Sequence, residues 1–223
     1  MKIARSGKEL LEICAAEQIS LSEYAIRQEM ELKNVSREDL FAQMKITLDA
    51  MKESATAGRE KKVYSLSGLI GGDAYRLQQY CNTGNSLMGN GIVMAMAISS
   101  SEVNGAMASG AVVELMGGTP KMSLDAAAII FKNVLGLVCD PVAGLVEIPC
   151  AKRNVSGAIN ALCTADMVMA GVNSKIPFDD AVAAMYKVGT GLPEELRETA
   201  LGGCAITPTG KALQEKVFGK KEN

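Results

Sequence analysis

The sequence predicts a mostly α-helical fold, and three observations carry this prediction. Apolar residues recur at helical spacing, as at Leu40, Met44, Leu48 and Met51. Helix-start signals are frequent, with a serine that can cap free N–H groups and an acidic residue three positions later. Alternating apolar and polar runs, which indicate strands, are lacking. With 223 residues the chain can bury a core as one domain, or as a domain with an appendage.

Residues 1–64 are predicted to form an N-terminal amphipathic helical region. Two helix-start signals fall in this region, Ser20-Leu-Ser-Glu23 and Ser36-Arg-Glu-Asp39. The charged run at 57–62 is expected to be a solvated boundary. Residues 65–223 then form a second helical region, which carries the residues that could bind a substrate or a metal.

The second region reads as helices separated by loops that contain glycine or proline. Residues 65–73 are expected to be a glycine-punctuated loop, and Gly117-Gly-Thr-Pro120 ends a helical segment that is rich in small residues and broken near its glycines. Pro177 and Pro193 stand where the first turn of a helix tolerates proline. The helices expected here, in chain order, cover residues 73–81, 86–115, 123–135, 152–170 and 178–188.

The composition argues against several classes of function. The net charge is −2, so nothing favours nucleic acid or an anionic membrane surface as a partner. The chain has no His, which excludes His-based catalytic triads, His metal ligands and a His general base. Acid–base chemistry must then come from Lys, Asp, Glu, Cys or Tyr, or from a partner chain. The best candidate for a membrane span, residues 91–99, is too short to cross a bilayer.

The chain has six cysteines but no recognisable secretory signal after Met1. We therefore expect a reducing cytosol, with thiols that are either packed or bound to metal. Cys14, Cys81 and Cys163 are expected to lie in the core. Cys204 follows two glycines and is the one remaining cysteine that could lie near a site.

Cys139 and Cys150 are separated by ten residues, and a proline stands close to each, Pro141 and Pro149. Because proline fixes φ and removes a backbone donor, this stretch is predicted to be an ordered loop that leads toward a helix. Two thiols on a stiff loop suit a soft metal centre, such as an iron–sulfur cluster, zinc or copper(I). The alternative is two buried cysteines that only pack, and the spacing alone favours it, because it matches none of the common zinc or ferredoxin patterns.

Three further groups could bind a small anionic substrate. A glycine-rich stretch could present backbone N–H groups to a carboxylate, or it could be a tight turn between helices. An asparagine could donate to a substrate oxygen or cap a helix. The charged pair after Cys150 could lower the pKa of that thiol and hold an acidic substrate, or it could be a solvated helix start. The candidate residues are Ser67, Gly68, Gly71, Gly72, Asn104, Lys152, Arg153 and Asn154.

Several stretches of the chain resemble a known family. The most specific stretch runs from Cys139 to Asn154 and reads Cys-Asp-Pro-Val-Ala-Gly-Leu-Val-Glu-Ile-Pro-Cys-Ala-Lys-Arg-Asn. The others, in chain order, are Ser67-Gly-Leu-Ile-Gly-Gly-Asp73, Ser101-Glu-Val-Asn104, Glu114-Leu-Met-Gly-Gly-Thr-Pro120, Leu196-Arg-Glu-Thr-Ala-Leu-Gly-Gly203 and Thr207-Pro-Thr-Gly210. Together they resemble the α chain, or α domain, of iron–sulfur L-serine dehydratases, also called L-serine ammonia-lyases. The resemblance covers nearly the whole chain and implies a helical domain like that α domain.

The resemblance implies an α subunit of a lyase that converts L-serine to pyruvate and ammonia in the cytoplasm, as part of gluconeogenesis. It implies a [4Fe-4S] cluster held by three cysteines, two of them Cys139 and Cys150, with one open iron that binds L-serine. The candidate residues named above would bind the substrate, and the catalytic base is unknown. Separate α chains of the family work with a β subunit, which is expected to complete the active site. Neither nucleic acid nor a membrane is expected as a partner.

The chain departs from the family pattern near residues 104–110. Family α chains carry several tens of residues between the motifs at Asn104 and Glu114, including Gly-Ser-Cys-Gly and one cluster ligand, and this block is absent here. Three explanations are open: a region left out of a normal enzyme, a true deletion that inactivates the chain, or replacement of the ligand by Cys204 or Cys163. We predict that the chain by itself cannot hold a stable four-iron cluster. The alternative function is a catalytically inactive helical remnant that still binds the β subunit.

Overall fold

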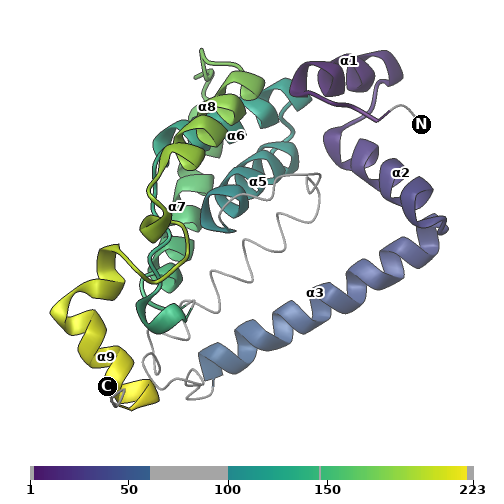
Figure 1. The fold of residues 1–223 in the computed structure, drawn as a ribbon. Helices are drawn as coiled ribbons and strands as arrows, with labels where there is room; N and C mark the ends of the chain where they lie inside the picture. The colour runs from purple at the N-terminus through teal and green to yellow at the C-terminus, as the bar shows by residue number, and fades with distance from the viewer. Residues whose placement is uncertain (1–2, 61–99, 146, 220–223) are drawn as a thin grey trace.

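The protein is described here by a computed structural model that covers residues 3–60, 100–145 and 147–219. Within these ranges the regular structure is helical, apart from an isolated parallel bridge between Cys139 and Arg197, which confirms the mostly α prediction (Figure 1). The α-helices are α1 (Gly7–Glu17), α2 (Leu21–Lys33), α3 (Arg37–Glu60), α5 (Ser100–Leu115), α6 (Pro120–Asn133), α7 (Cys150–Met169), α8 (Phe178–Gly191) and α9 (Pro208–Phe218). Short 3-10 helices are η1 (Val142–Gly144), η2 (Glu194–Leu196) and η3 (Gly203–Ile206).

The core is built around α6, which packs against α5, α7 and α8. Nearly every α6 residue from Ser123 to Phe131 is buried, as expected for a helix that is covered on all sides. Ala108, Ala126 and Ala165 on the three central helices are fully buried. Because alanine side chains are small, the helix backbones can approach closely. The Ala-rich composition therefore serves helix packing.

The N-terminal helices attach to this core through polar contacts at helix starts. The Asp179 carboxylate of α8 accepts hydrogen bonds from the Gly7 and Lys8 N–H groups at the start of α1, at 2.6 and 3.1 Å. The Glu114 carboxylate of α5 accepts from the Ser22 hydroxyl and N–H at the start of α2. Each contact satisfies N–H groups that have no partner within their own helix.

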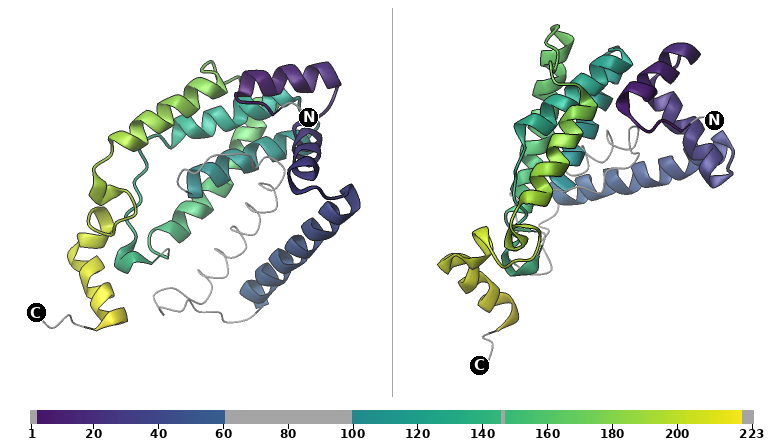
Figure 2. Two further views of the ribbon diagram at one scale, coloured as in Figure 1. Left: turned by 45° about the vertical axis from the view of Figure 1, so that its right-hand side comes forward. Right: turned by 45° about the horizontal axis from the view of Figure 1, so that its top comes forward.

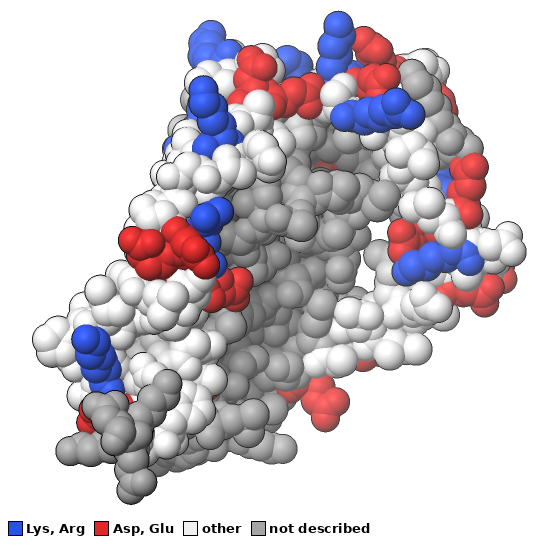
Figure 3. Space-filling model, in the orientation of Figure 1, with Lys and Arg blue, Asp and Glu red and all other residues white. Residues whose placement is uncertain are grey.

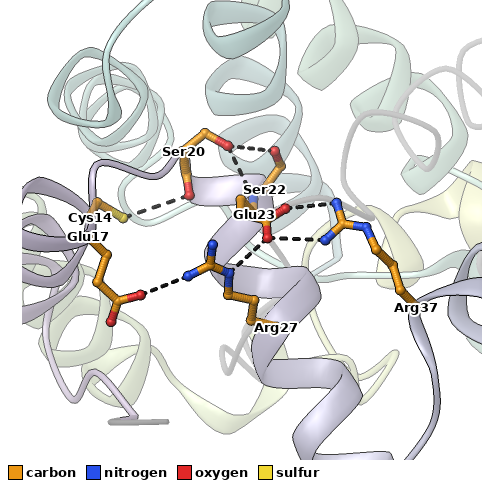
Figure 4. Close-up of polar contacts among 7 residues, drawn as sticks. All are labelled: Cys14, Glu17, Ser20, Ser22, Glu23, Arg27 and Arg37. Carbon is orange, nitrogen blue, oxygen red and sulfur yellow. Dashed lines mark hydrogen bonds and ion pairs between the residues drawn. The ribbon is translucent and has the colours of Figure 1, made fainter.

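An ion-pair network holds the turn between α2 and α3 (Figure 4). Glu23 accepts from Arg27 at 2.8 Å and from both terminal nitrogens of Arg37, at 3.1 and 2.8 Å. Arg27 also pairs with Glu17 at the end of α1. The three helices of the N-terminal corner are thus joined by charges on the surface.

Two views show where these parts lie relative to the core. α3 continues from the corner that it forms with α2, and α9 lies at the opposite end of the molecule from α1 (Figure 2). Among the described elements, α3 packs on α2. Lys and Arg side chains are interspersed with Asp and Glu on the face drawn in Figure 3. None of the helices within the described ranges is long and apolar enough to cross a membrane.

Local capping signals located several helix starts correctly. Ser20 accepts from the Glu23 N–H at 3.2 Å, and Ser36 accepts from the Asp39 N–H at 3.1 Å, as the sequence predicts. Leu40 is buried, and Met44 and Leu48 are half-buried, which fits the predicted apolar face of α3. The glycine-punctuated loop at 65–73, the helix at 73–81 and the boundary at residue 64 lie outside the described residues.

Other boundaries differ from the sequence-based expectation. α6 begins at Pro120 rather than Ser123, because Thr119 caps it by accepting from the Met122 N–H at 3.3 Å and proline suits the first helical position. α7 begins at Cys150 rather than Lys152, and α8 continues past Val188 to Gly191. Pro193 precedes a short 3-10 helix, η2, instead of opening an α-helix.

Candidate functional site

The two predicted thiol ligands lie within and directly after the loop that joins α6 to α7. We call residues 134–149, which join α6 to α7, the cysteine loop. Cys139 is half-buried within it, and Cys150 follows it as the buried first residue of α7. Within the loop the Val142 N–H donates to the Ile148 carbonyl at 2.8 Å, and Pro141 is fully buried. The described residues of the loop, 134–145 and 147–149, lead directly into a helix, as the sequence predicts.

Asp140, next to Cys139, ties this loop to two other parts of the chain. Its side chain is buried, and one oxygen accepts from the Arg153 guanidinium of α7 at 2.8 Å. The other oxygen accepts from the Cys204 N–H of η3 at 2.6 Å. Burial by itself would raise the pKa of Asp140, but the hydrogen bonds from Cys204 and Arg153 outweigh it and hold the pKa below its ordinary value. Asp140 is therefore an ionised carboxylate at neutral pH.

Residues 194–207, here called the C-terminal segment, lie along the cysteine loop. The Cys139 N–H donates to the Leu196 carbonyl at 2.9 Å, and the Cys139 carbonyl accepts from the Glu198 N–H at 2.7 Å. These bonds form the parallel bridge between Cys139 and Arg197. α9 then packs on η1 and η3, and Thr207 caps it by accepting from the Gly210 N–H at 3.0 Å. Thr207 is therefore the cap at the start of α9.

The thiols of Cys150 and Cys204 are not activated by their surroundings. Burial raises the pKa of Cys150, and Arg153 offsets this only in part. Arg153 does lower the pKa of this thiol, as the sequence suggests, but burial outweighs it and the net pKa lies above the ordinary value. The hydrogen bond with the Asp140 carboxylate raises the pKa of Cys204, and burial adds to this. In this arrangement both cysteines are protonated at neutral pH.

The fit of an iron–sulfur cluster can be tested against the side chains around the loop. In the part of the chain that the structure describes, no group of three or more Cys, Asp or Glu side chains is arranged to hold a metal ion. Asp140, the acidic group beside Cys139, is already committed to Arg153 and Cys204. The described residues therefore do not fit a cluster that needs three protein ligands.

The structure places the predicted substrate-binding residues in different situations. Lys152 is exposed on the first turn of α7, and Asn154 is half-buried on the next. Arg153 bonds Asp140 and also donates to the Val138 carbonyl at 2.6 Å, so it organises the loop. Asn104 lies within α5. Ser67, Gly68, Gly71 and Gly72 lie outside the described residues.

A pocket of about 430 Å³ adjoins the cysteine loop. It lies between the end of α6 and the first half of α7. Its polar lining comes from Asn133, Arg153, Ser156 and Asn160, and its apolar lining includes Ile130 and Leu137. A larger pocket of about 610 Å³ lies elsewhere, where α1, α6 and the start of α8 meet. The smaller pocket is lined by the first residues of the cysteine loop, 134–137, and not by Cys139 or Cys150 themselves.

Sequence reasoning missed Asp140 and misplaced one cysteine. The stretch Cys139-Asp-Pro141 contained a weak signal, because an acidic residue that becomes buried must find partners, but those partners lie 13 and 64 residues away. Cys163 was expected in the core and is exposed on α7, because it lies on the face of the helix that turns away from α5 and α6. Cys14 is buried as expected, and Cys81 lies outside the described residues.

Comparison with known proteins identifies the family. The family model described as "Serine dehydratase alpha chain" matches residues 16–107 and 105–205. A probable L-serine dehydratase alpha chain of Bacillus subtilis is 39% identical over 287 residues, which cover 96% of this chain and 95% of that protein. The L-serine dehydratase alpha chain of Peptoniphilus asaccharolyticus is 31% identical over 281 residues, covering 94% and 96%. An L-serine dehydratase of Streptomyces coelicolor is 43% identical over 101 residues, covering 45% and 22%.

The lengths of these alignments bear on the absent block. An alignment of 287 positions that spans 96% of a 223-residue chain must contain gaps in this chain. The two matches to the family model meet at residues 105–107, within α5. Because the family model and two relatives together match the chain from its N-terminal region to beyond the cysteine loop, the chain belongs to the serine dehydratase alpha chain family.

Proposed function

We propose that this chain is the α subunit of an L-serine dehydratase, an iron–sulfur lyase of the cytoplasm that converts L-serine to pyruvate and ammonia. The observation that carries the proposal is the likeness to the alpha chain of Bacillus subtilis, which runs across 95% of that protein. Several other relatives carry the name L-serine dehydratase. The reaction removes the α proton and the β-hydroxyl of serine, and the resulting enamine hydrolyses to pyruvate, a precursor in gluconeogenesis.

The pocket beside the cysteine loop is the place in this chain where we propose that serine binds. Ser156, Asn133 and Asn160 offer hydroxyl and amide groups that can hydrogen-bond a small zwitterion. The other proposed contacts are Ser67, Gly68, Gly71, Gly72, Asn104, Lys152 and Asn154, together with the remaining donors of Arg153, which lines the pocket. The chain has no His, so the base that removes the α proton is another residue type or comes from the β subunit.

The iron–sulfur part of the proposal rests on the family and on the two thiols at Cys139 and Cys150. When bound, such a cluster supplies a Lewis-acidic iron that can polarise a hydroxyl group. The described residues do not complete its ligand set, so we assign no step of the reaction to it. Completion would require the absent block, another cysteine or the partner subunit.

A second candidate is a catalytically inactive helical chain that still binds a β subunit. It is motivated by the gaps that the Bacillus subtilis alignment leaves in this chain and by the incomplete metal-ligand set among the described side chains. The helical core around α6 is closely packed in spite of the missing block, so a folded but inactive subunit is physically consistent.

Co-expression with a β chain of this enzyme family separates the two candidates. The complex is purified without oxygen, and pyruvate formation from L-serine and iron content are measured. A matched chimera carries the central block of the Bacillus subtilis alpha chain inserted after Asn104. Pyruvate formation by the chain as it stands supports the enzyme. Co-purification without pyruvate or iron, with activity restored in the chimera, supports the inactive subunit. Failure of both proteins to bind the β chain would contradict both candidates.

A further inference from the structure

We propose that Asp140 is a positioning residue that latches the C-terminal segment onto the cysteine loop and so fixes the places of Cys139 and Cys150. The proposal goes beyond the proposed function, because it requires neither serine nor a bound metal. It concerns the shape that this loop holds in the chain alone.

The first support is that one buried carboxylate joins three segments. Asp140 belongs to the cysteine loop, Arg153 to α7 and Cys204 to η3, and the two carboxylate oxygens bond one partner each, at 2.8 and 2.6 Å. Only 2% of Asp140 is exposed, so water does not replace a lost partner easily. Each of the two bonds involves an ionised group, which makes it stronger than a bond between neutral groups.

The second support is that the latch acts on both cysteines. Arg153 also holds the Val138 carbonyl, so the residues on both sides of Cys139 are bonded to the same guanidinium. The Cys139 backbone itself is bonded to Leu196 and Glu198 of the C-terminal segment. Cys150 lies three residues before Arg153, on the same side of the first turns of α7. A change at Asp140 therefore reaches Cys139 through the loop and Cys150 through Arg153.

The third support is a steric fit between Asp140 and Gly203. Gly203 has a φ of +56°, in the left-handed region that glycine adopts most easily. A Cβ atom there would lie 2.7 Å from the Asp140 Cβ, well inside van der Waals contact. The C-terminal segment can therefore reach the carboxylate only because this position has no side chain.

The test is the alkylation rate of each cysteine in the full, reduced chain, read by peptide mass spectrometry after short exposure to N-ethylmaleimide. The variant is Asp140→Asn, whose amide can accept from only one of the two donors. The matched control is Asp125→Asn, which removes the carboxylate of an ion pair within α6, with Lys121 at 2.6 Å. We expect Cys139 and Cys150 to react faster by about tenfold in Asp140→Asn and to be unchanged in the control.

Two cysteines of the same chain serve as internal references. Cys14 is buried in the N-terminal corner and Cys163 is exposed on α7, so both should keep the parent's rates if Asp140 acts locally. Equal acceleration of Cys14 would overturn the proposal, because Asp140 would then support the whole fold. Unchanged rates at Cys139 and Cys150 would overturn it too.

A second variant changes the C-terminal segment instead of Asp140, and it tests the proposal even if Asp140→Asn fails to fold. Gly203→Ala places a methyl group against Asp140, and it should also accelerate Cys139 and Cys150. Its control is Gly171→Ala, because Gly171 has a φ of +93° but nothing within 4 Å of the added Cβ. If both glycine variants give the same rates, the contact with Asp140 has no role and the proposal is wrong.

Discussion

Gly203 and Asp140 lie so close together that a Cβ at Gly203 would come within 2.7 Å of the Asp140 Cβ. The two residues are far apart in the sequence, one beside Cys139 and the other near the C-terminal end. Their contact brings η3 onto the cysteine loop and lets the Cys204 N–H reach the carboxylate. The region around the predicted thiol ligands therefore depends on Gly203, which lies outside the cysteine loop.

Removing the partner of the buried carboxylate should destabilise the fold strongly. Arg153→Met leaves the Asp140 charge buried without its ion pair, and we expect the free energy of unfolding to fall by about 3 kcal/mol. The measurement is urea denaturation followed by circular dichroism.

The matched control for this change is Lys121→Met. Lys121 forms an ion pair with Asp125, and the lysine side chain is 67% exposed. We therefore expect the free energy of unfolding to fall by less than about 1 kcal/mol. Similar losses in the two variants would contradict the view that burial makes the Asp140–Arg153 pair important.

Asp179 should hold the N-terminal helix against α8. Its carboxylate accepts from two N–H groups at the start of α1, so Asp179→Ala leaves both without that partner. We expect amide hydrogen exchange in the first turn of α1 to become about tenfold faster. Asp180→Ala is the control, because Asp180 lies in the same first turn of α8 but is exposed. Faster exchange in the control as well would point to α8 itself as the cause.

Acid should weaken the corner between α2 and α3. Hydrogen bonds from Arg37 and Arg27 lower the pKa of Glu23 from 4.5 to about 2. A carboxyl group whose pKa is lower in the folded chain stabilises the fold at pH values above its pKa in the unfolded chain. This contribution is lost as the pH falls through its pKa in the folded chain. The thermal midpoint of Glu23→Gln should therefore lie below the parent's at pH 6, and the gap should close between pH 4.5 and pH 2. A gap that does not change with pH would contradict this assignment.

The reactivity of Cys204 should report on its carboxylate neighbour. The hydrogen bond with Asp140 raises the pKa of the Cys204 thiol, so Asp140→Asn should lower that pKa. The alkylation rate of Cys204, followed against pH, should then rise at lower pH than in the parent. The exposed Cys163 of the same chain is the reference, and its profile should not move. A Cys204 profile that stays in place or shifts to higher pH would contradict the role of Asp140.

Local sequence features determined the helical class, several helix starts and the order of the cysteine loop. Ser20, Ser36 and Thr207 cap helices through N–H groups only three residues away, so the sequence contains all that such a contact needs. Pro141 and Pro149 restrict their own backbone, and the Val142 N–H donates to the Ile148 carbonyl between them. The sequence-based prediction started α6 at Ser123, three residues late. Ser123 resembles a capping residue, but the residue that caps the helix is Thr119, which precedes Pro120.

Only the tertiary structure decided what surrounds the thiols. Asp140 finds its partners at Arg153 and Cys204, and no periodicity or spacing in the sequence connects these positions. Arg153 reads as a substrate ligand beside a cysteine, yet the fold commits it to a buried carboxylate. Cys14 and Cys163 both lie on amphipathic helices, and packing buries one and exposes the other. The physical reason is the same in each case: hydrogen bonds within a turn are encoded over three or four residues, whereas burial and charge pairing depend on which distant segments the folded chain brings together.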